Sequence, residues 1–480
     1  MTEYGIINWI GEVVMQTISN VCSFIATLEL IAAPILLIIW LVRKIRGSDY
    51  FVNPIPDYET VLQRSHLLDC KNRIMVEFFL LGRKVRTVEM LNYFADALNC
   101  LEGLNVVKRD GIDYVQLDEL ILISYQSCFF FVSTPYSFPH CISNTLDVYV
   151  GPDTYYLANN LYNENHETIL DLCTGSGIQL ILGCKKACAK HGVGVDINDN
   201  ACKIARINVS LNAMDEIIDI KSGDLYDPVG SELFDLIYSN PPFIPVPQTV
   251  QYPLCGDGGE FGLDVLKTII SGLSSHLTKN GKVLIFGEML GTDNEWLISK
   301  YLCSSDSTLR YKLLILGCTD IITQIDRTSS VATRLNNFDL SMLKKSWEAR
   351  YRDLSITRYG SFLLYGQNGV IPSYHEVQLY SESTFAAQVV PHLLVDYKST
   401  TIDDTYIISF SNGNTISVDR TVFEFIEFVK TNEYYTIKDI FENMRLNKEG
   451  CDCQSLLEQI TFFSRKLGRI GIFALKEAQL

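Results

Sequence analysis

The middle of the chain alternates short apolar runs with helical patterns, which is typical of a domain built on a parallel sheet. Buried strands are predicted at residues 168–172, 192–196 and 234–238, and a further strand ends at Ser222. A helical pattern follows the first strand at residues 178–184. The carboxyl ends of parallel strands share one edge of the sheet, where such sheets bind ligands. The pattern therefore predicts an α/β domain whose ligand site lies at this edge.

Three of the strands end in residues that suit a nucleoside ligand. Asp171 is followed by a turn containing Gly175 and Gly177, and glycines let the backbone approach a ligand closely. The third glycine of the dinucleotide fingerprint is absent, so this turn alone does not identify the ligand. Asp196, at the end of the second strand, can bind both hydroxyls of a ribose. Asp224 follows the third strand.

The fourth strand runs into Asn240, Pro241, Pro242 and Phe243. Proline fixes φ and lacks an N–H group, so the two prolines stiffen this loop. The Asn240 side chain and the carbonyl of residue 241 can aim hydrogen-bond acceptors at one planar NH2 group, and the Phe243 ring can cover its face. The tetrapeptide favours methylation of a nitrogen, whereas a simple proline-rich turn is the alternative for these residues taken alone.

Taken together, residues 148–300 resemble a class I S-adenosylmethionine-dependent methyltransferase. The pattern is similar to the release-factor glutamine N5-methyltransferases and the related guanine and adenine amino-methyltransferases. Residues 150–154 and 258–264 resemble segments before the first strand and after the catalytic loop of that group, and Phe243 stands where glutamine methylators more often carry Tyr. The resemblance implies a Rossmann-like, mostly parallel sheet and the cofactor S-adenosyl-L-methionine. It implies cofactor contacts from Asp171, Thr174, Gly175, Gly177, Asp196, Ile197, Asp224, Leu225 and Asn240, and catalysis at Asn240, Pro241, Pro242 and Phe243.

The predicted function is N-methylation of a glutamine-like side-chain amide, or of an amine, in a protein or peptide. One alternative is amino-methylation of adenine or guanine in RNA or DNA, and another is a non-catalytic partner-binding protein with a degenerate methyltransferase fold. The formal net charge of −16 disfavours nucleic acid, whose binders usually show a basic face, although residues 310–358 are net basic. Asp171 and Asp224 also have structural interpretations, as an acid satisfied by backbone N–H groups and as the cap of a turn.

With 480 residues, 47% of them hydrophobic, the chain can bury the cores of two to four domains. Its 14 cysteines are scattered and several fall inside apolar runs, which indicates a reducing, cytoplasmic location. The pairs Cys184/Cys188 and Cys451/Cys453 lack a convincing second pair of ligands, so no metal site is predicted.

Residues 1–48 form a hydrophobic amino-terminal segment. Between residues 13 and 42 the only charged residue is Glu29, and the basic residues of 43–46 follow. The segment is not a signal peptide, because the positive cluster comes after the apolar run. Residues 13–46 are a candidate membrane anchor that would leave the enzyme facing the cytosol. The strictly uncharged run 30–42 is short for a span, so a core or dimer helix is the alternative.

Residues 49–147 are predicted to form a winged-helix-like accessory domain before the methyltransferase domain at 148–368. Thr87 is expected to cap a helix that ends at 101–103, with Val88, Leu91, Phe94, Ala95 and Leu98 on one side. A hairpin is expected around Asp110-Gly111. The domain binds a nucleic acid or a protein, or only packs, and the sequence leaves these three open.

Residues 369–480 carry a second small module. A hairpin turning at Asn412-Gly413 precedes three helical patterns, the second of which Thr436 is expected to cap. This order is similar to the domains that deliver precursor peptides to modifying enzymes, and it equally suits a winged helix. In the first case an edge strand would capture the peptide by strand addition. Packing or dimerisation is the alternative role.

Overall fold

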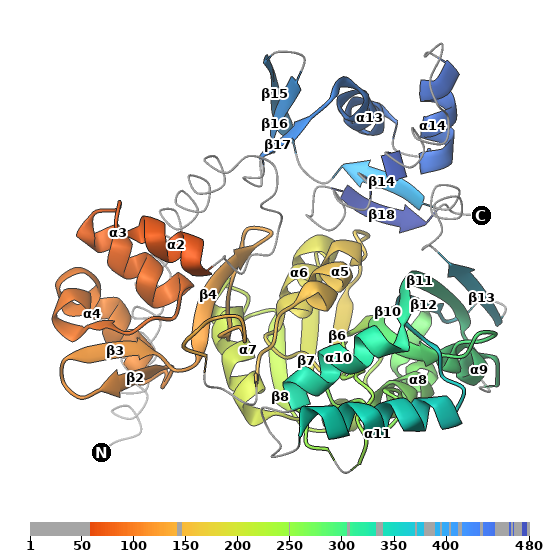
Figure 1. Cartoon of the computed structure of the whole chain (residues 1–480), viewed down its shortest axis with the longest axis horizontal. Coiled ribbons are helices and arrows are strands. Elements are labelled where there is room, and N and C mark those ends of the chain that lie inside the picture. The colour runs from red at the N-terminus through yellow and green to blue at the C-terminus, as the bar shows by residue number, and fades with distance from the viewer. Residues whose placement is uncertain are drawn as a thin grey trace, which may run out of the picture. The chain divides into compact units, whose positions relative to one another are not determined.

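The computed structural model describes residues 58–141, 146–248, 250–304, 308–332, 339–369, 372–378, 389–393, 396–402, 405–410, 415–432, 435–446, 460–461, 464 and 473–477 (Figure 1). These residues belong to two compact units. The smaller contains residues 58–141 together with 206–216, and the larger contains the rest.

An eight-stranded sheet forms the centre of the larger unit. Its strand order is β13-β11-β12-β10-β9-β6-β7-β8. In that order the strands are Ser373–Gln378, Arg310–Asp320, Arg358–Gln367, Leu277–Gly291, Phe234–Ser239, Thr168–Leu172, His191–Asp196 and Ile218–Ser222. The five strands from β10 to β8 are parallel, whereas β12 runs antiparallel to both β10 and β11. The predicted α/β domain with a mostly parallel sheet is confirmed.

Seven helices alternate with these strands among the described residues of this part of the chain. They are α5 (Pro152–Asn160), α6 (Ile178–Ala187), α7 (Asp199–Leu211), α8 (Asp264–His276), α9 (Leu297–Ser304), α10 (Ile321–Ala332) and α11 (Leu340–Asp353). A short 3-10 helix spans Asp227–Val229. The predicted helical pattern at residues 178–184 lies inside α6.

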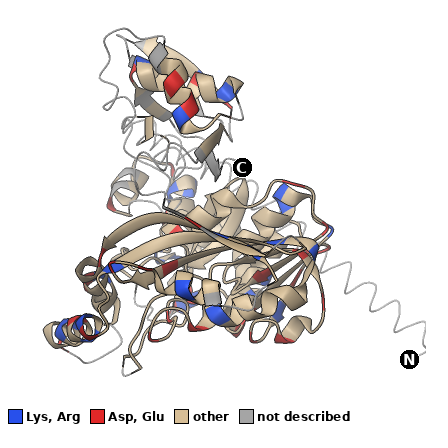
Figure 2. Ribbon diagram, turned by 90° about the vertical axis from the view of Figure 1, so that its right-hand side faces the viewer, with Lys and Arg blue, Asp and Glu red and all other residues tan. Residues whose placement is uncertain are grey.

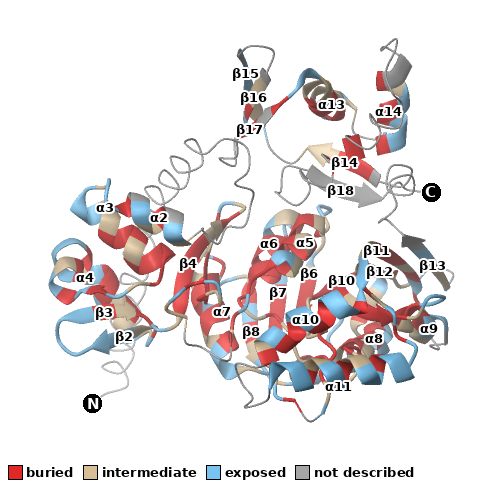
Figure 3. Ribbon diagram, in the orientation of Figure 1, coloured by how far each residue is buried: buried red, intermediate tan, exposed pale blue. Residues whose placement is uncertain are grey.

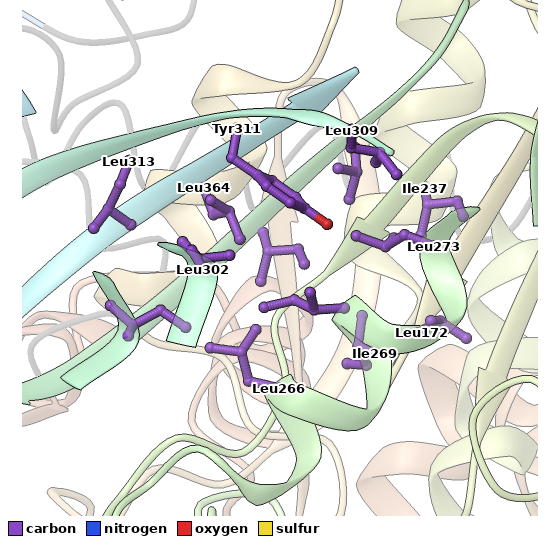
Figure 4. Close-up of a cluster of buried hydrophobic side chains, with 14 of the residues drawn as sticks. Leu172, Ile237, Leu266, Ile269, Leu273, Leu302, Leu309, Tyr311, Leu313 and Leu364 are labelled. Carbon is purple, nitrogen blue, oxygen red and sulfur yellow. The ribbon is translucent and has the colours of Figure 1, made fainter. Parts of the chain in front are cut away.

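A continuous apolar core fills one face of the sheet beneath α8 and α9. Figure 4 shows Leu266, Ile269 and Leu273 of α8 facing Leu172, Ile237 and Tyr311 of the strands. All of these residues are at most 2% exposed. Figure 3 shows the same distribution, with the central strands buried. Burial of this area supplies most of the driving force for the fold and fixes the strand ends in register.

The helices α10 and α11 are inserted between the antiparallel strands β11 and β12. They form a second core cluster with the segment that follows Asn240, through Ile244, Val246 and Val250. Trp347 of α11 is 2% exposed and Tyr359 of β12 is equally buried in this cluster. The inserted helices α10 and α11 therefore pack against the loop that follows β9.

The smaller unit begins with α2 (Tyr58–Ser65), α3 (Cys70–Met75) and a π-helical turn (Val76–Leu80). β1 (Val85–Arg86), α4 (Thr87–Gly103), β2 (Val107–Asp110), β3 (Tyr114–Leu117), β4 (Leu120–Tyr125) and β5 (Cys128–Ser133) follow. The first three strands form a sheet in the order β1-β3-β2, and β4 pairs with β5. Asn208 and Asn212 also belong to this unit and hydrogen-bond the backbone of Phe131 and Phe129 in β5.

The predicted helix and hairpin of this unit are both present, but two details of the helix prediction are wrong. Thr87 is the first helical residue rather than a cap, and its buried hydroxyl makes no hydrogen bond with the described residues. Val88 and Leu91 are 51% and 43% exposed. The buried face of α4 instead runs through Thr87, Met90, Phe94, Ala97, Leu98 and Leu101, and the helix is kinked at Phe94, where φ is −142° and ψ is 37°.

The carboxyl-terminal elements are β14 (Val389–Leu393), β15 (Tyr397–Ile402), β16 (Thr405–Phe410), β17 (Thr415–Val418), α13 (Arg420–Thr431), α14 (Ile437–Leu446) and β18 (Phe473–Glu477). The predicted hairpin is confirmed, because β16 pairs antiparallel with β17. The Thr436 hydroxyl accepts from the Asp439 backbone N–H at 3.1 Å, which confirms the predicted cap. The third helical pattern lies mostly outside the described residues.

The hydrophobic segment at residues 13–46 and the pair Cys451/Cys453 also lie outside the described residues. In the portion that the structure does describe, no helix has the length and apolar character needed to cross a bilayer. The same portion holds no cluster of three or more His, Cys, Asp or Glu side chains arranged to bind a metal ion.

Candidate active site

The carboxyl ends of β6, β7, β8 and β9 bring the predicted site residues to one edge of the sheet. Asp171 pairs with Gly194 and Asp196 pairs with Ser222 in the parallel registers. Leu172 of β6 pairs with Ser239, the residue before Asn240. The Ser239 hydroxyl donates to the Leu172 carbonyl at 2.8 Å, which ties the start of the proline loop to the first strand.

The glycine turn after β6 is built around the buried carboxyl of Asp171, which is 1% exposed. The Thr174 hydroxyl donates to this carboxyl at 2.6 Å, and the Thr174 backbone N–H donates to the Val195 carbonyl at 3.0 Å. Burial raises the pKa of Asp171 to about 7. The hydroxyl of Thr174, rather than backbone N–H groups alone, therefore satisfies this acid.

Positions 175 and 177 require glycine for different reasons. Their φ angles are +53° and +76°, a region that side chains with a Cβ rarely adopt. A Cβ on Gly175 would have no heavy atom within 4 Å, so this face of the turn is open. A Cβ on Gly177 would lie 3.6 Å from the Cβ of Ala205, so this glycine packs against helix α7. The open side at Gly175 is where a ligand can approach the backbone.

Asp196 organises the turn from the neighbouring strand. One carboxylate oxygen accepts from the Gly175 N–H at 2.8 Å, and the other accepts from the Asn198 N–H at 2.9 Å. Burial raises the pKa of Asp196, and these two backbone hydrogen bonds oppose that shift. A carboxylate has about four lone-pair positions, so acceptor capacity remains for two hydroxyls. Ile197 follows with 58% of its surface exposed, which leaves an apolar face for a flat ring.

Asp224 and Leu225 lie just after β8, as predicted, but they differ in burial. Asp224 is exposed, and its backbone carbonyl accepts from the Asp227 N–H at 3.0 Å. Leu225 has a φ of +43° and packs against the main core. The position of Asp224 fits both a ligand contact and the start of the turn, so its role stays a prediction.

The loop from Asn240 to Phe243 is held by the glycine-rich stretch at residues 258–264. The N–H of Gly258 donates to the Ile244 carbonyl at 2.9 Å, and the N–H of Ile244 donates to the Gly256 carbonyl at 2.8 Å. A Cβ on Gly258 would lie 2.8 Å from the Phe243 Cα, so only glycine allows this approach. The Phe243 ring meets the Phe286 ring edge to face at 5.7 Å.

Asn240 has a partner that the sequence did not indicate. Its Nδ2 group donates to the Asp153 carboxylate at 2.7 Å. Its other amide atom, Oδ1, is buried and makes no hydrogen bond with any part of the chain that the structure describes. An unsatisfied buried acceptor costs about 1–3 kcal/mol, which a bound N–H donor would recover. The amide oxygen is therefore available to a substrate group.

A second polar group lines the same edge from the strands that follow. The Glu288 carboxylate of β10 accepts from the Tyr359 hydroxyl of β12 at 2.6 Å and pairs with Arg327 of α10 at 2.5 Å. Burial raises the pKa of Asp153, and the negative charge of Glu288 adds to the shift against the lowering effect of Asn240. Sequence reasoning assigned no role to Asp153, Glu288 or Tyr359, and it placed Arg327 only within the net basic stretch at 310–358.

Three basic residues of the stretch at 310–358 pair with acids among the described residues. Besides the Arg327–Glu288 pair, Lys344 pairs with Asp326 at 2.6 Å and Arg350 pairs with Glu260. Figure 2 shows Lys and Arg interspersed with Asp and Glu along the chain. Part of the local positive charge is therefore compensated within the protein, which weakens the case for this stretch as a nucleic-acid footprint.

Comparison with known proteins identifies the domain that contains this edge. The family described as methyltransferase small domain matches residues 149–291. A Methanocaldococcus jannaschii protein with the name "putative protein N5-glutamine methyltransferase" is 33% identical over 147 residues, which are 30% of this chain and 73% of that protein. The chain belongs to the class I methyltransferases, in the group of the N5-glutamine methyltransferases. The implied cofactor is S-adenosylmethionine, and the open face at Gly175 beside Asp196 suits a nucleoside.

Two further relatives of this methyltransferase fit the same group. The ribosomal protein uL3 glutamine methyltransferase of Bradyrhizobium diazoefficiens is 36% identical over 126 residues, 25% of this chain and 40% of that protein. The release factor glutamine methyltransferase of Thermodesulfovibrio yellowstonii is 33% identical over 135 residues, 26% of this chain and 48% of that protein. The match thus spans less than half the length of these two relatives.

Proposed function

We propose that this methyltransferase transfers a methyl group from S-adenosylmethionine to the amide nitrogen of a glutamine side chain in a protein or peptide. The observation that carries the proposal is the buried Oδ1 of Asn240, which lacks a donor among the described residues at the edge that holds Gly175 and Asp196. A primary amide brings an NH2 group that satisfies this oxygen. The named activities of the relatives support the same acceptor class.

The cofactor supplies an electrophilic methyl group when it is bound. On the cofactor side, Asp196 would hold the ribose hydroxyls, and the open backbone at Gly175 would allow close approach. We propose that Asp171, Thr174, Gly177, Ile197, Asp224 and Leu225 complete this half of the site.

On the acceptor side, Asn240 would accept a hydrogen bond from the substrate NH2, and the stiff Pro241 and Pro242 would keep that acceptor in place. Phe243 would cover the amide plane, and the Phe286 ring behind it limits its movement. The main contribution of these residues is alignment and exclusion of water, which can supply several kcal/mol. The bond from nitrogen to carbon forms as the carbon–sulfur bond breaks, and the nitrogen releases its proton afterwards.

The test of this function uses Asn240→Ala with tritiated S-adenosylmethionine and the protein fraction of a nuclease-treated lysate. The variant should bind the cofactor normally and lose about a hundredfold in methyl transfer, since it loses the contact that orients the acceptor. Asn240→Asp still accepts hydrogen bonds and should keep partial activity. Near-normal transfer by Asn240→Ala would show that the proline loop is only a turn.

For the flanking parts we propose the roles that the sequence predicts. The order of helices and strands in residues 58–117, with the sheet order β1-β3-β2, supports a winged-helix-like accessory domain at residues 49–147. The three strands β15, β16 and β17 followed by α13 and α14 support a peptide-recognition or winged-helix domain at residues 369–480. An edge strand of its sheet would bind the peptide that carries the acceptor.

The amino-terminal segment is proposed as a membrane anchor on the basis of its sequence alone. Its apolar run ends in the basic residues of 43–46, which favours placement of the methyltransferase domain on the cytoplasmic side. Membrane attachment would then concentrate the enzyme near acceptors at the same surface.

A further inference from the structure

The contact between Asp153 and Asn240 joins two segments that are far apart in the sequence. Asp153 lies in the first turn of α5, and Asn240 follows β9. The distance from Asn240 Nδ2 to the Asp153 carboxylate is 2.7 Å. Gly151 makes room for this arrangement, because a Cβ there would lie 1.9 Å from the Tyr149 hydroxyl oxygen and 2.9 Å from Asp153 Oδ1. The glycine lets Tyr149 and Asp153 converge.

The chemistry of this pair decides which atom of Asn240 meets the acceptor. A side-chain amide can present either its NH2 group or its oxygen, and the two are close in shape. An ionised carboxylate only accepts hydrogen bonds. Asp153 in that form therefore takes the NH2 end of Asn240 and leaves Oδ1 for the acceptor.

We propose that Asp153 is the positioning residue of the acceptor site: its carboxylate fixes the Asn240 amide so that Oδ1 selects an acceptor that donates an N–H. The inference rests on the proposed function and deepens it. An acceptor without an N–H, such as a carboxylate, leaves the buried Oδ1 unsatisfied and is rejected. The selection follows from the hydrogen-bond inventory of the two side chains rather than from pocket size.

The charged and titratable neighbours of Asp153 make the orientation of the Asn240 amide sensitive to pH. Tyr149 approaches from the segment before α5, Glu288 from β10 and Cys255 from the loop before the glycine-rich stretch. Arg327 of α10 is paired with Glu288. Burial and the charge of Glu288 raise the pKa of Asp153 above its ordinary value, which is about 4. As pH falls through this raised pKa, Asp153 gains a proton that it can donate, and the orientation of Asn240 is no longer imposed.

A purely structural role for Asp153 is the rival explanation. An acid in the first turn stabilises a helix through the helix dipole. That role affects the stability of α5, but it does not link methyl transfer to the ionisation of Asp153. The pH profile of transfer therefore separates the two explanations.

The experiment measures tritiated methyl transfer by the full chain at saturating cofactor, from pH 5 to 9, with protein from a nuclease-treated lysate as acceptor. The rate of the wild type should fall toward acid pH, and we call this part of the profile the acid limb. Its midpoint should lie above the ordinary pKa range of an aspartate. Asp153→Asn should lose about 10- to 100-fold at pH 8, with cofactor affinity within twofold, because its amide no longer imposes one orientation. Its residual rate should lack the acid limb. Asp326→Asn, which removes an equal charge from the exposed face of α10, should match the wild type.

A second variant protects the test against misfolding of the first. Glu288→Gln removes the negative neighbour that raises the pKa of Asp153, so the acid limb should move to lower pH. An Asp153→Asn enzyme with the wild-type rate and acid limb, or a limb that Glu288→Gln leaves in place, would overturn the positioning role. A wild type that labels no protein would instead overturn the proposed function on which the inference rests.

Discussion

Asp196 is the residue whose removal should most clearly separate cofactor binding from acceptor binding. Its carboxylate accepts from the N–H groups of Gly175 and Asn198 at 2.8 and 2.9 Å, and the proposal adds two ribose hydroxyls. Asp196→Ala removes the hydroxyl contacts and also loosens the glycine turn. Hydrogen bonds to a charged group contribute about 1.5–3 kcal/mol each, with strong non-additivity. We expect a net loss of about 1–3 kcal/mol, or roughly 5- to 150-fold in affinity.

The assay is titration calorimetry with S-adenosylmethionine and with the product S-adenosylhomocysteine. Asp219→Ala is the matched control, because Asp219 is an exposed acid on the adjacent strand β8 and lies away from the carboxyl edge. This control should bind within twofold of the wild type, and so should Asn240→Ala. Wild-type affinity in a folded Asp196→Ala variant would refute the assignment of the ribose site.

Three further predictions concern the loop, the buried acid and the amino terminus. Gly258→Ala places a Cβ 2.8 Å from the Phe243 Cα and should displace the loop. Methyl transfer should therefore fall about tenfold with little change in cofactor affinity. Unaltered kinetics of methyl transfer would contradict the proposed acceptor loop. The pKa of Asp171 is raised to about 7 from about 4 in the unfolded chain, so the folded state binds the extra proton and the free energy of unfolding should rise as pH falls from 8 to 5. Denaturant titrations of Asp171→Asn should lack about 1.4 kcal/mol per pH unit of that slope, and an identical slope would refute the buried acid. The full chain should sediment with membranes and resist carbonate extraction, whereas a chain starting at Asp49 should stay in the supernatant and remain active; a full chain in the supernatant would exclude an anchor.

The sequence predicts well which residues lie at this edge of the sheet, because those signals are local. Apolar runs mark the strands, the polar residue at each strand end is visible in one segment, and parallel pairing brings these ends to one edge. Asp171, Gly175 and Asp196 lie there as predicted. The conformation of the turn is also local, since positive φ angles select glycine.

The acceptor half could not be predicted to the same depth because its contacts are long-range. Asp153 and Asn240 are 87 positions apart, and Glu288 and Tyr359 are 71 apart. These pairs depend on where α5 packs on the sheet and where β12 lies within it. The hydrophobic periodicity of the sequence does not indicate either position. The error in α4 has the same origin, since only packing against the rest of the unit decides that Met90 and Ala97 are buried while Val88 and Leu91 are exposed.

The most direct test of the central claim is the chemical identity of the methylated group. Protein labelled with tritiated S-adenosylmethionine by the wild-type chain is separated from nucleic acid and hydrolysed in strong acid. Methylation of a glutamine side-chain nitrogen predicts that the label is released as methylammonium, because hydrolysis of the N-methyl amide breaks its carbon–nitrogen bond to the carbonyl, and that it becomes volatile methylamine once the hydrolysate is made alkaline. Label that stays on a non-volatile amino acid, or that is recovered in the nucleic acid, would contradict the account.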